Sequence, residues 1–253
     1  MMRVLLALMM VCVVPAHAQN TPRFEKSQEQ ARVHTDLASR YYQVGQVAVA
    51  VDEAKIALQS AADYVPAHTV LALIYAQLRI DDLADVHFNA ALNAAAAQKL
   101  SQTDVRNSYA WFLCNSGQGE RALQAFASVL QDPLYGSMDK ALINAGACAA
   151  RLKRKDLAVP YLNAAIDVNP DNAAAYVYRA HALLDDARYS EAQSDMRRLG
   201  SMLPDSAELL WLKLRLATLQ NNGQAPTLMQ QLLREHPNSA PANWARSNHF
   251  ELF

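Results

Sequence analysis

The 253-residue chain lacks the short motifs that mark the common enzyme classes. It contains no H-E-x-x-H zinc spacing, no G-x-S-x-G nucleophile elbow and no phosphate-binding loop. Cys114 and Cys148 have no C-x-x-C neighbours of the kind that a structural zinc ion requires. We therefore expect a non-enzymatic protein with no metal site and no cofactor.

The chain also lacks an excess of positive or negative charge, and it lacks the alternation of polar and apolar residues that is typical of strands. Its 23 basic residues balance 24 acidic ones, and both signs are interspersed. This balance does not indicate a nucleic-acid groove. The longest basic cluster, formed by Arg151, Lys153, Arg154 and Lys155, lies where a predicted helix ends and where positive charge suits the helix dipole. No useful length of chain alternates polar and apolar residues, so we expect only helices.

Long apolar runs are absent except at the N-terminus. Met1–Arg3 is a short basic start, and the apolar run Val4–Val14 is too short for a bilayer, which needs about 20 residues. Ala16 and Ala18 then supply small residues at the two positions that a signal peptidase reads. We predict that residues 1–18 are a cleaved signal peptide and that the mature chain is exported and soluble.

Cys12 offers an alternative for this end of the chain. Lipidation favours a small residue directly before the cysteine and a leucine three positions before it, whereas this chain has Val11 and Met9. Lipidation at Cys12 is therefore weakly supported, and the alternative stays open.

The main feature that is present is a period of 34 residues with small side chains at fixed offsets. Such a period is typical of tetratricopeptide repeats, in which two antiparallel helices stack on their neighbours. It predicts an all-α, right-handed α-solenoid of about six helix pairs, which binds other proteins. The matching positions are Leu37, Ala38, Tyr41, Ala50 and Ala57 against Leu71, Ala72, Tyr75, Ala84 and Ala91, and Ala158, Leu162, Ala165 and Pro170 against Ala192, Met196, Leu199 and Pro204.

The repeat divides the mature chain into three segments. Residues 19–30 are polar and are expected to form a flexible lead-in, and residues 31–238 form the repeat array. Residues 239–253 leave the repeat and form either an end cap, built on Trp244, Phe250 and Phe253, or a tail. The six helix pairs are predicted to begin near Ala31, Val65, Thr103, Asp139, Ala173 and Ala207.

Two cysteines remain after removal of the signal peptide. Cys114 and Cys148 fall in the first helices of adjacent repeats, one repeat apart. Because the bacterial periplasm is oxidising and adjacent helices lie about 8–10 Å apart, the sequence favours a disulfide between them. Two independent buried cysteines are the alternative.

The first helices are also expected to line a concave groove that holds a segment of a partner protein. Trp111 and Trp211 are the strongest candidates because tryptophan and arginine are enriched at binding hot spots. Packing of each tryptophan in a seam between helices is the alternative. The predicted groove residues are Thr35, Ser39, Tyr42, Thr69, Leu73, Asn107, Trp111, Ile143, Arg151, Val177, His181, Trp211 and Arg215.

The third repeat carries strings that a generic repeat does not need: N-S-Y-A-W-F-L-C at 107–114, D-P-L-Y at 132–135 and N-A-G-A-C-A at 144–149. With these strings the chain resembles the PilF/PilW family of type IV pilus biogenesis and stability proteins, over roughly Ala31–Pro237. The resemblance implies a periplasmic role in a Gram-negative bacterium, in which the chain assembles or stabilises the outer-membrane secretin.

The resemblance bears on membrane anchoring and on the expected partners. Many members of the family are lipoproteins, whereas the cleavage site here resembles a non-lipid one, which puts membrane anchoring in doubt. The expected partners are proteins, namely the secretin or other pilus assembly components, with no nucleic acid and no small-molecule substrate. A periplasmic scaffold for another envelope complex is the alternative.

Overall fold

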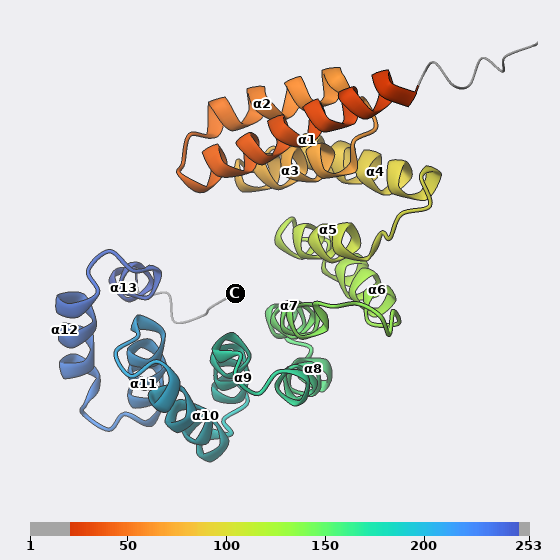
Figure 1. Cartoon of the computed structure of the whole chain (residues 1–253). Coiled ribbons are helices and arrows are strands. Elements are labelled where there is room, and N and C mark those ends of the chain that lie inside the picture. The colour runs from red at the N-terminus through yellow and green to blue at the C-terminus, as the bar shows by residue number, and fades with distance from the viewer. Residues whose placement is uncertain (1–20, 248–253) are drawn as a thin grey trace, which may run out of the picture. The chain divides into compact units, whose positions relative to one another are not determined.

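The computed structural model describes residues 21–247, and within them the chain forms thirteen helices and no strand. The predicted signal peptide and Cys12 lie outside the described residues. The predicted all-α class is confirmed (Figure 1). The helices are α1 Thr21–Gln43, α2 Val47–Ser60, α3 Val65–Gln77, α4 Asp81–Ala97, α5 Thr103–Asn115, α6 Gly119–Val129, α7 Met138–Arg151, α8 Lys155–Val168, α9 Ala173–Asp185, α10 Tyr189–Met202, α11 Ala207–Gln220, α12 Ala225–Glu235 and α13 Ala240–Arg246.

The helices form six consecutive antiparallel pairs in two compact units. Unit 1 (residues 1–99) contains the pairs α1/α2 and α3/α4. Unit 2 (residues 100–253) contains the pairs α5/α6, α7/α8, α9/α10 and α11/α12, followed by α13. Five of the six pairs begin within one residue of the predicted positions, because the period sets the spacing of the helices.

The turn inside each pair is built in the same way. One of the two residues directly after the first helix has a positive φ in all six pairs, and these residues follow one another at intervals of 34, 38, 36, 34 and 34. The next residue donates its backbone N–H to the carbonyl five positions earlier, as in a Schellman motif. Only two of the six residues are glycines, so the stacking of the helices holds the others in a left-handed conformation. The six are Gly45, Arg79, Gly117, Lys153, Ala187 and Asn221.

The recurring alanines explain why the pairs pack closely. Ala38 and Ala72 in first helices, and Ala50 and Ala84 in second helices, are fully buried. A methyl group is small enough for two helix backbones to approach at the short end of the usual spacing. A larger side chain at these positions would have to push the helices apart.

First helices and second helices make different contacts. In unit 2, α7 packs against both α5 and α9, and α11 packs against α9. No second helix packs against another second helix within residues 21–247. Helices on the inside of a curved stack lie closer together than those outside, so the first helices form the inner face of unit 2 (Figure 1).

The N-terminal segment differs from the prediction. Residues 21–30 belong to α1, whereas a flexible lead-in was expected over 19–30. Polar residues support the helix at the end of this segment and beyond it, because Arg32 donates to Glu29 and to Asp36 one turn away on either side. Such pairs stabilise an exposed helix by a few tenths of a kcal/mol each.

The C-terminal segment contains a short helix. α13 packs against α11 and α12, and its Trp244 lies 6.1 Å from Trp211 between ring centroids. Ser239 caps the helix by accepting from the N–H of Ala242. Phe250 and Phe253, the other aromatic residues expected in a cap, lie outside the described residues.

Two glycines test the close packing of the pairs. A Cβ on Gly146 in α7 would lie 2.6 Å from Cγ of Leu162 in α8, whereas a Cβ on Gly200 in α10 would meet only a Leu209 methyl at 3.8 Å. We expect Gly146→Ala to lower the free energy of unfolding by about 1–3 kcal/mol through overpacking. Gly200→Ala should leave it unchanged or raise it by up to about 1 kcal/mol. Urea denaturation measures both, and equal effects would contradict this packing.

Candidate partner-binding face

The inner face of unit 2 is held together by contacts that repeat from one first helix to the next. Most of these contacts join residues 34 to 37 positions apart, which is about one repeat, and the ion pair between Asp185 and Arg215 spans 30 positions. The contacts are covalent between α5 and α7, polar along the same two helices, and charged between α9 and α11. They position the side chains that were predicted to line the groove.

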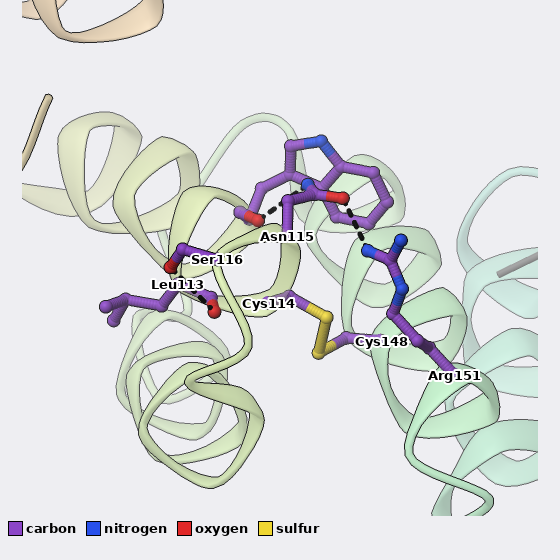
Figure 2. The surroundings of a disulfide bond; sticks show 7 residues. Leu113, Cys114, Asn115, Ser116, Cys148 and Arg151 are labelled. Atoms are coloured by element: carbon purple, nitrogen blue, oxygen red, sulfur yellow. Dashed lines mark hydrogen bonds between the residues drawn. A yellow bond between two sulfur atoms is a disulfide. The ribbon is translucent and has the colours of Figure 1, made fainter. Parts of the chain in front are cut away.

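The covalent contact is the predicted disulfide, which is present in the structure. Cys114 in α5 and Cys148 in α7 are joined with a Cα–Cα distance of 5.9 Å (Figure 2). Both residues are buried. The bond ties two adjacent repeats together at the C-terminal ends of their first helices.

Polar residues continue this connection beside the disulfide. Arg151 at the end of α7 donates to Oδ1 of Asn115 at 2.5 Å, one residue after Cys114 (Figure 2). Asn115 in turn donates to the backbone carbonyl of Trp111. About two turns earlier on the two helices, Asn144 donates to Oδ1 of Asn107 at 3.5 Å. The predicted residues Asn107, Trp111 and Arg151 therefore lie along one seam of the inner face, and the two amides and the indole are only half-buried.

The charged contact lies between α9 and α11. Arg215 is buried and donates from one nitrogen to Nδ1 of His181 and from another to the carboxylate of Asp185, both at 2.6 Å. Burial, and secondly the charge of Arg215, hold the pKa of His181 well below its ordinary value of 6.5. Because a guanidinium only donates, Nδ1 accepts and the neutral imidazole carries its proton on Nε2.

An apolar pocket of about 440 Å³ opens beside this contact. Val177 and His181 of α9, Trp211 of α11 and Trp244 of α13 line it. The pocket brings together three of the predicted groove residues. It also includes Trp244, which was expected only as part of an end cap.

Besides His181 and Arg215, three further predicted groove residues are buried. Thr35 donates to the carbonyl of Ala31 on its own helix and is 4% exposed. Ile143 belongs to the core between α7, α8 and α9, because Asn144 rather than Ile143 faces Asn107. Trp211 is fully buried and packs in a cluster with residues of α12 and of α13, the second of which lies outside the predicted repeat array.

In unit 1, the two first helices are also joined by a polar contact that spans about one repeat. The hydroxyl of Tyr42 in α1 donates to Oε1 of Gln77 in α3, again about one repeat away. Leu73 is 38% exposed. The hydroxyls of Ser39 and Thr69 donate to backbone carbonyls one turn earlier on their own helices.

Four residues of the inner face were not predicted from the sequence: Asn115, Asn144, Tyr178 and Asp185. The spacing of the repeats could have predicted the first two. The third and fourth repeats begin about 36 residues apart, so this offset pairs Asn115 with Arg151 and nearly pairs Asn107 with Asn144. Asp185 lies 30 positions before Arg215, so an offset of one repeat does not predict that contact.

Membrane-spanning helices and metal-binding clusters were looked for among the described residues. No helix within residues 21–247 has both the length and the apolar character that a membrane crossing demands. The same residues hold no cluster of three or more histidine, cysteine, aspartate or glutamate side chains placed to bind a metal ion.

Comparison with known proteins identifies the fold through solved structures. No protein-family profile and no curated protein sequence matches the chain. PilF of Pseudomonas aeruginosa is 23% identical, with a TM-score of 0.69 over 88% of this chain and 99% of PilF. PilW, described as a widely conserved type IV pilus biogenesis factor, is 25% identical, with a TM-score of 0.74 over 84% of this chain and 96% of PilW.

Tetratricopeptide proteins of other kinds share the same fold. A protein of Parabacteroides merdae is 14% identical, with a TM-score of 0.69 over 87% of this chain and 84% of that protein. The structural neighbours thus include PilF and PilW, the two proteins whose family the sequence resembles.

The disulfide gives the first prediction for this face. Loop closure across 34 residues of sequence separation stabilises a fold by about 3–4 kcal/mol. We expect Cys114→Ala/Cys148→Ala to lower the free energy of unfolding by about this amount. Mass spectrometry of non-reduced protein that was folded under oxidising conditions should find the two cysteine peptides joined, and free thiols would contradict the bond.

His181 predicts a dependence of stability on pH. The unfolded chain takes up a proton at this residue below pH 6.5 while the folded chain does not, so stability falls as the pH falls. The contribution reaches about 1.4 kcal/mol per pH unit. His181→Gln keeps an acceptor for Arg215 and cannot titrate. Urea denaturation at pH 7.5, 6 and 5 should therefore give a flatter profile for the variant, and identical profiles would show that His181 protonates freely in the fold.

Proposed function

We propose that this chain is a non-catalytic scaffold of type IV pilus biogenesis in the periplasm of a Gram-negative bacterium. It binds the outer-membrane secretin or an associated pilus assembly component through the inner face of its repeats. Its likeness to PilW carries the proposal, because this likeness extends over most of both chains and includes the sequence identity of 25%.

The kinds of side chain on the inner face support a protein partner. The seam along α5 and α7 presents amide, guanidinium and indole groups, which suit the backbone and side chains of a peptide segment. Asn107, Trp111 and Arg151 contribute these groups.

Pre-organisation is the physical basis of the proposed mechanism. A binding face that is already ordered loses less conformational entropy when a partner binds, and this raises affinity without any new contact. The disulfide and the Arg151–Asn115 contact hold α5 and α7 at a fixed spacing. No covalent step is needed for a scaffold to act in this way.

The ratio of secretin multimer to monomer tests the proposal in cells. In a strain that lacks this gene, unboiled gels should show loss of the multimer, and the wild-type gene should restore it. Unchanged multimer with fewer pili would move the role to fibre stability. If multimer and pili were both unchanged, the pilus proposal would fail and a scaffold for another envelope complex would replace it.

Trp111 allows the binding face to be tested in the same strain. Trp111 is half-buried, whereas its neighbour Phe112 is in the core. Trp111→Ala should abolish complementation while changing the melting temperature little, since hot-spot truncations cost about 2–4 kcal/mol of binding. Phe112→Ala is the matched control and should lower stability by about 3–5 kcal/mol. A Trp111→Ala variant that melts as early as Phe112→Ala would make Trp111 a packing residue.

A further inference from the structure

Aromatic side chains line the pocket between α9, α11 and α13. Its volume of about 440 Å³ falls in the usual range of about 300–1,000 Å³ for ligand sites. Tyr178 of α9 and Trp244 of α13 line it, and both residues are half-buried, so part of each remains accessible. Trp211 is fully buried and packs against Trp244, with 6.1 Å between the ring centroids. An occupant of this pocket would therefore meet aromatic surface from two helices.

A carboxylate also lines this aromatic pocket. Glu208, in the first turn of α11, is exposed and belongs to the lining. It forms no ion pair with any other residue in the described part of the chain. No lysine or arginine lines the pocket among residues 21–247. The pocket therefore complements a positively charged group.

The nearby cation does not cancel this charge. Arg215 donates to His181, which lines the pocket, but the same guanidinium is paired with the carboxylate of Asp185 at 2.6 Å. His181 is neutral, because burial and secondly the charge of Arg215 hold its pKa well below 6.5. The charge that remains on the lining is that of Glu208.

Aromatic rings beside a carboxylate favour a guanidinium over other cations. An aromatic face attracts a cation placed over it, and most strongly when the cation is partly desolvated. A guanidinium is planar, stacks on such faces and forks onto a carboxylate, whereas an ammonium is a compact, strongly hydrated charge. This chain already contains that combination on α9 and α10. Arg179 lies 5.6 Å from the centroid of the Tyr176 ring and donates to both carboxylate oxygens of Asp195.

We propose that this pocket binds the side chain of an arginine that a protein partner supplies. The guanidinium stacks on the aromatic lining and pairs with Glu208, and the aliphatic part of the side chain lies against Val177 and Leu203, which also line the pocket. The identity of the partner rests on the proposed function, so the arginine would come from the pilus assembly component that binds the inner face. The chemistry of the pocket does not depend on that identity.

Nuclear magnetic resonance of the purified full-length chain tests the inference, with N-acetyl-L-arginine amide as the probe. The three tryptophans each give an indole N–H signal, and Trp111 lies on α5 outside the pocket. The probe should shift the Trp244 signal with an affinity in the millimolar range and leave the Trp111 signal in place. N-acetyl-L-norleucine amide, which has an aliphatic side chain without a charge, should bind about two- to fivefold more weakly.

A charge-removing variant isolates the role of the carboxylate. Glu208→Gln keeps the size of the side chain and should weaken binding of the arginine probe by about two- to fivefold. Asp205→Asn is the matched control, because Asp205 is exposed just before α11 and does not line the pocket, and it should bind as the wild type does. Both residues are exposed, and an unchanged Trp111 signal shows that each variant keeps its fold.

Three results would overturn this assignment of the pocket. The first is equal affinity for the arginine and norleucine probes, and the second is equal affinity of the wild type and Glu208→Gln for the arginine probe. The third is a shift at Trp111 as large as that at Trp244, which would mean binding to tryptophan in general. Because no partner enters the titration, these results leave the pilus proposal untouched, and the ratio of secretin multimer to monomer tests that proposal separately.

Discussion

The close contact between successive first helices is the constraint on which the inner face depends. Fully buried alanines at fixed offsets let the helices of each pair approach, and α5, α7, α9 and α11 then touch one another in sequence. Second helices are separated on the outer side. The curvature of unit 2 and the grouping of polar side chains on its inner face follow from this one difference.

A disulfide and polar contacts between adjacent repeats reinforce the packing of the first helices at the proposed binding face. Cys114 and Cys148 are bonded at the same place where Arg151 reaches Asn115, so the third and fourth repeats are fixed by a covalent and a polar contact together. Farther along, the buried Arg215 links two repeats, and burial together with the charge of Arg215 lowers the pKa of His181 and keeps it neutral. The face is therefore ordered before any partner arrives.

The sequence predicted those parts of the structure that depend on local periodicity. Starts such as Val65 and Thr103, and the pairing of the two cysteines, follow from residue types at a fixed offset. Long-range packing decided the rest. Trp211 occupies a groove position of its repeat but is buried, because α12 and α13 cover it. Residues 19–30 were expected to be a flexible lead-in, yet residues 21–30 belong to α1, in which Arg32 pairs with Glu29 one turn away.

Site-specific photocrosslinking in cells tests most directly whether the inner face holds the partner. A photoreactive phenylalanine analogue would replace Trp111 on α5 in one strain and Tyr189 on the outer helix α10 in another. Both changes keep an aromatic ring at the position. We expect an adduct with the secretin or another pilus assembly component from position 111 and none from position 189. An adduct from position 189 alone would contradict it, because the partner would then bind the outer side of the repeats.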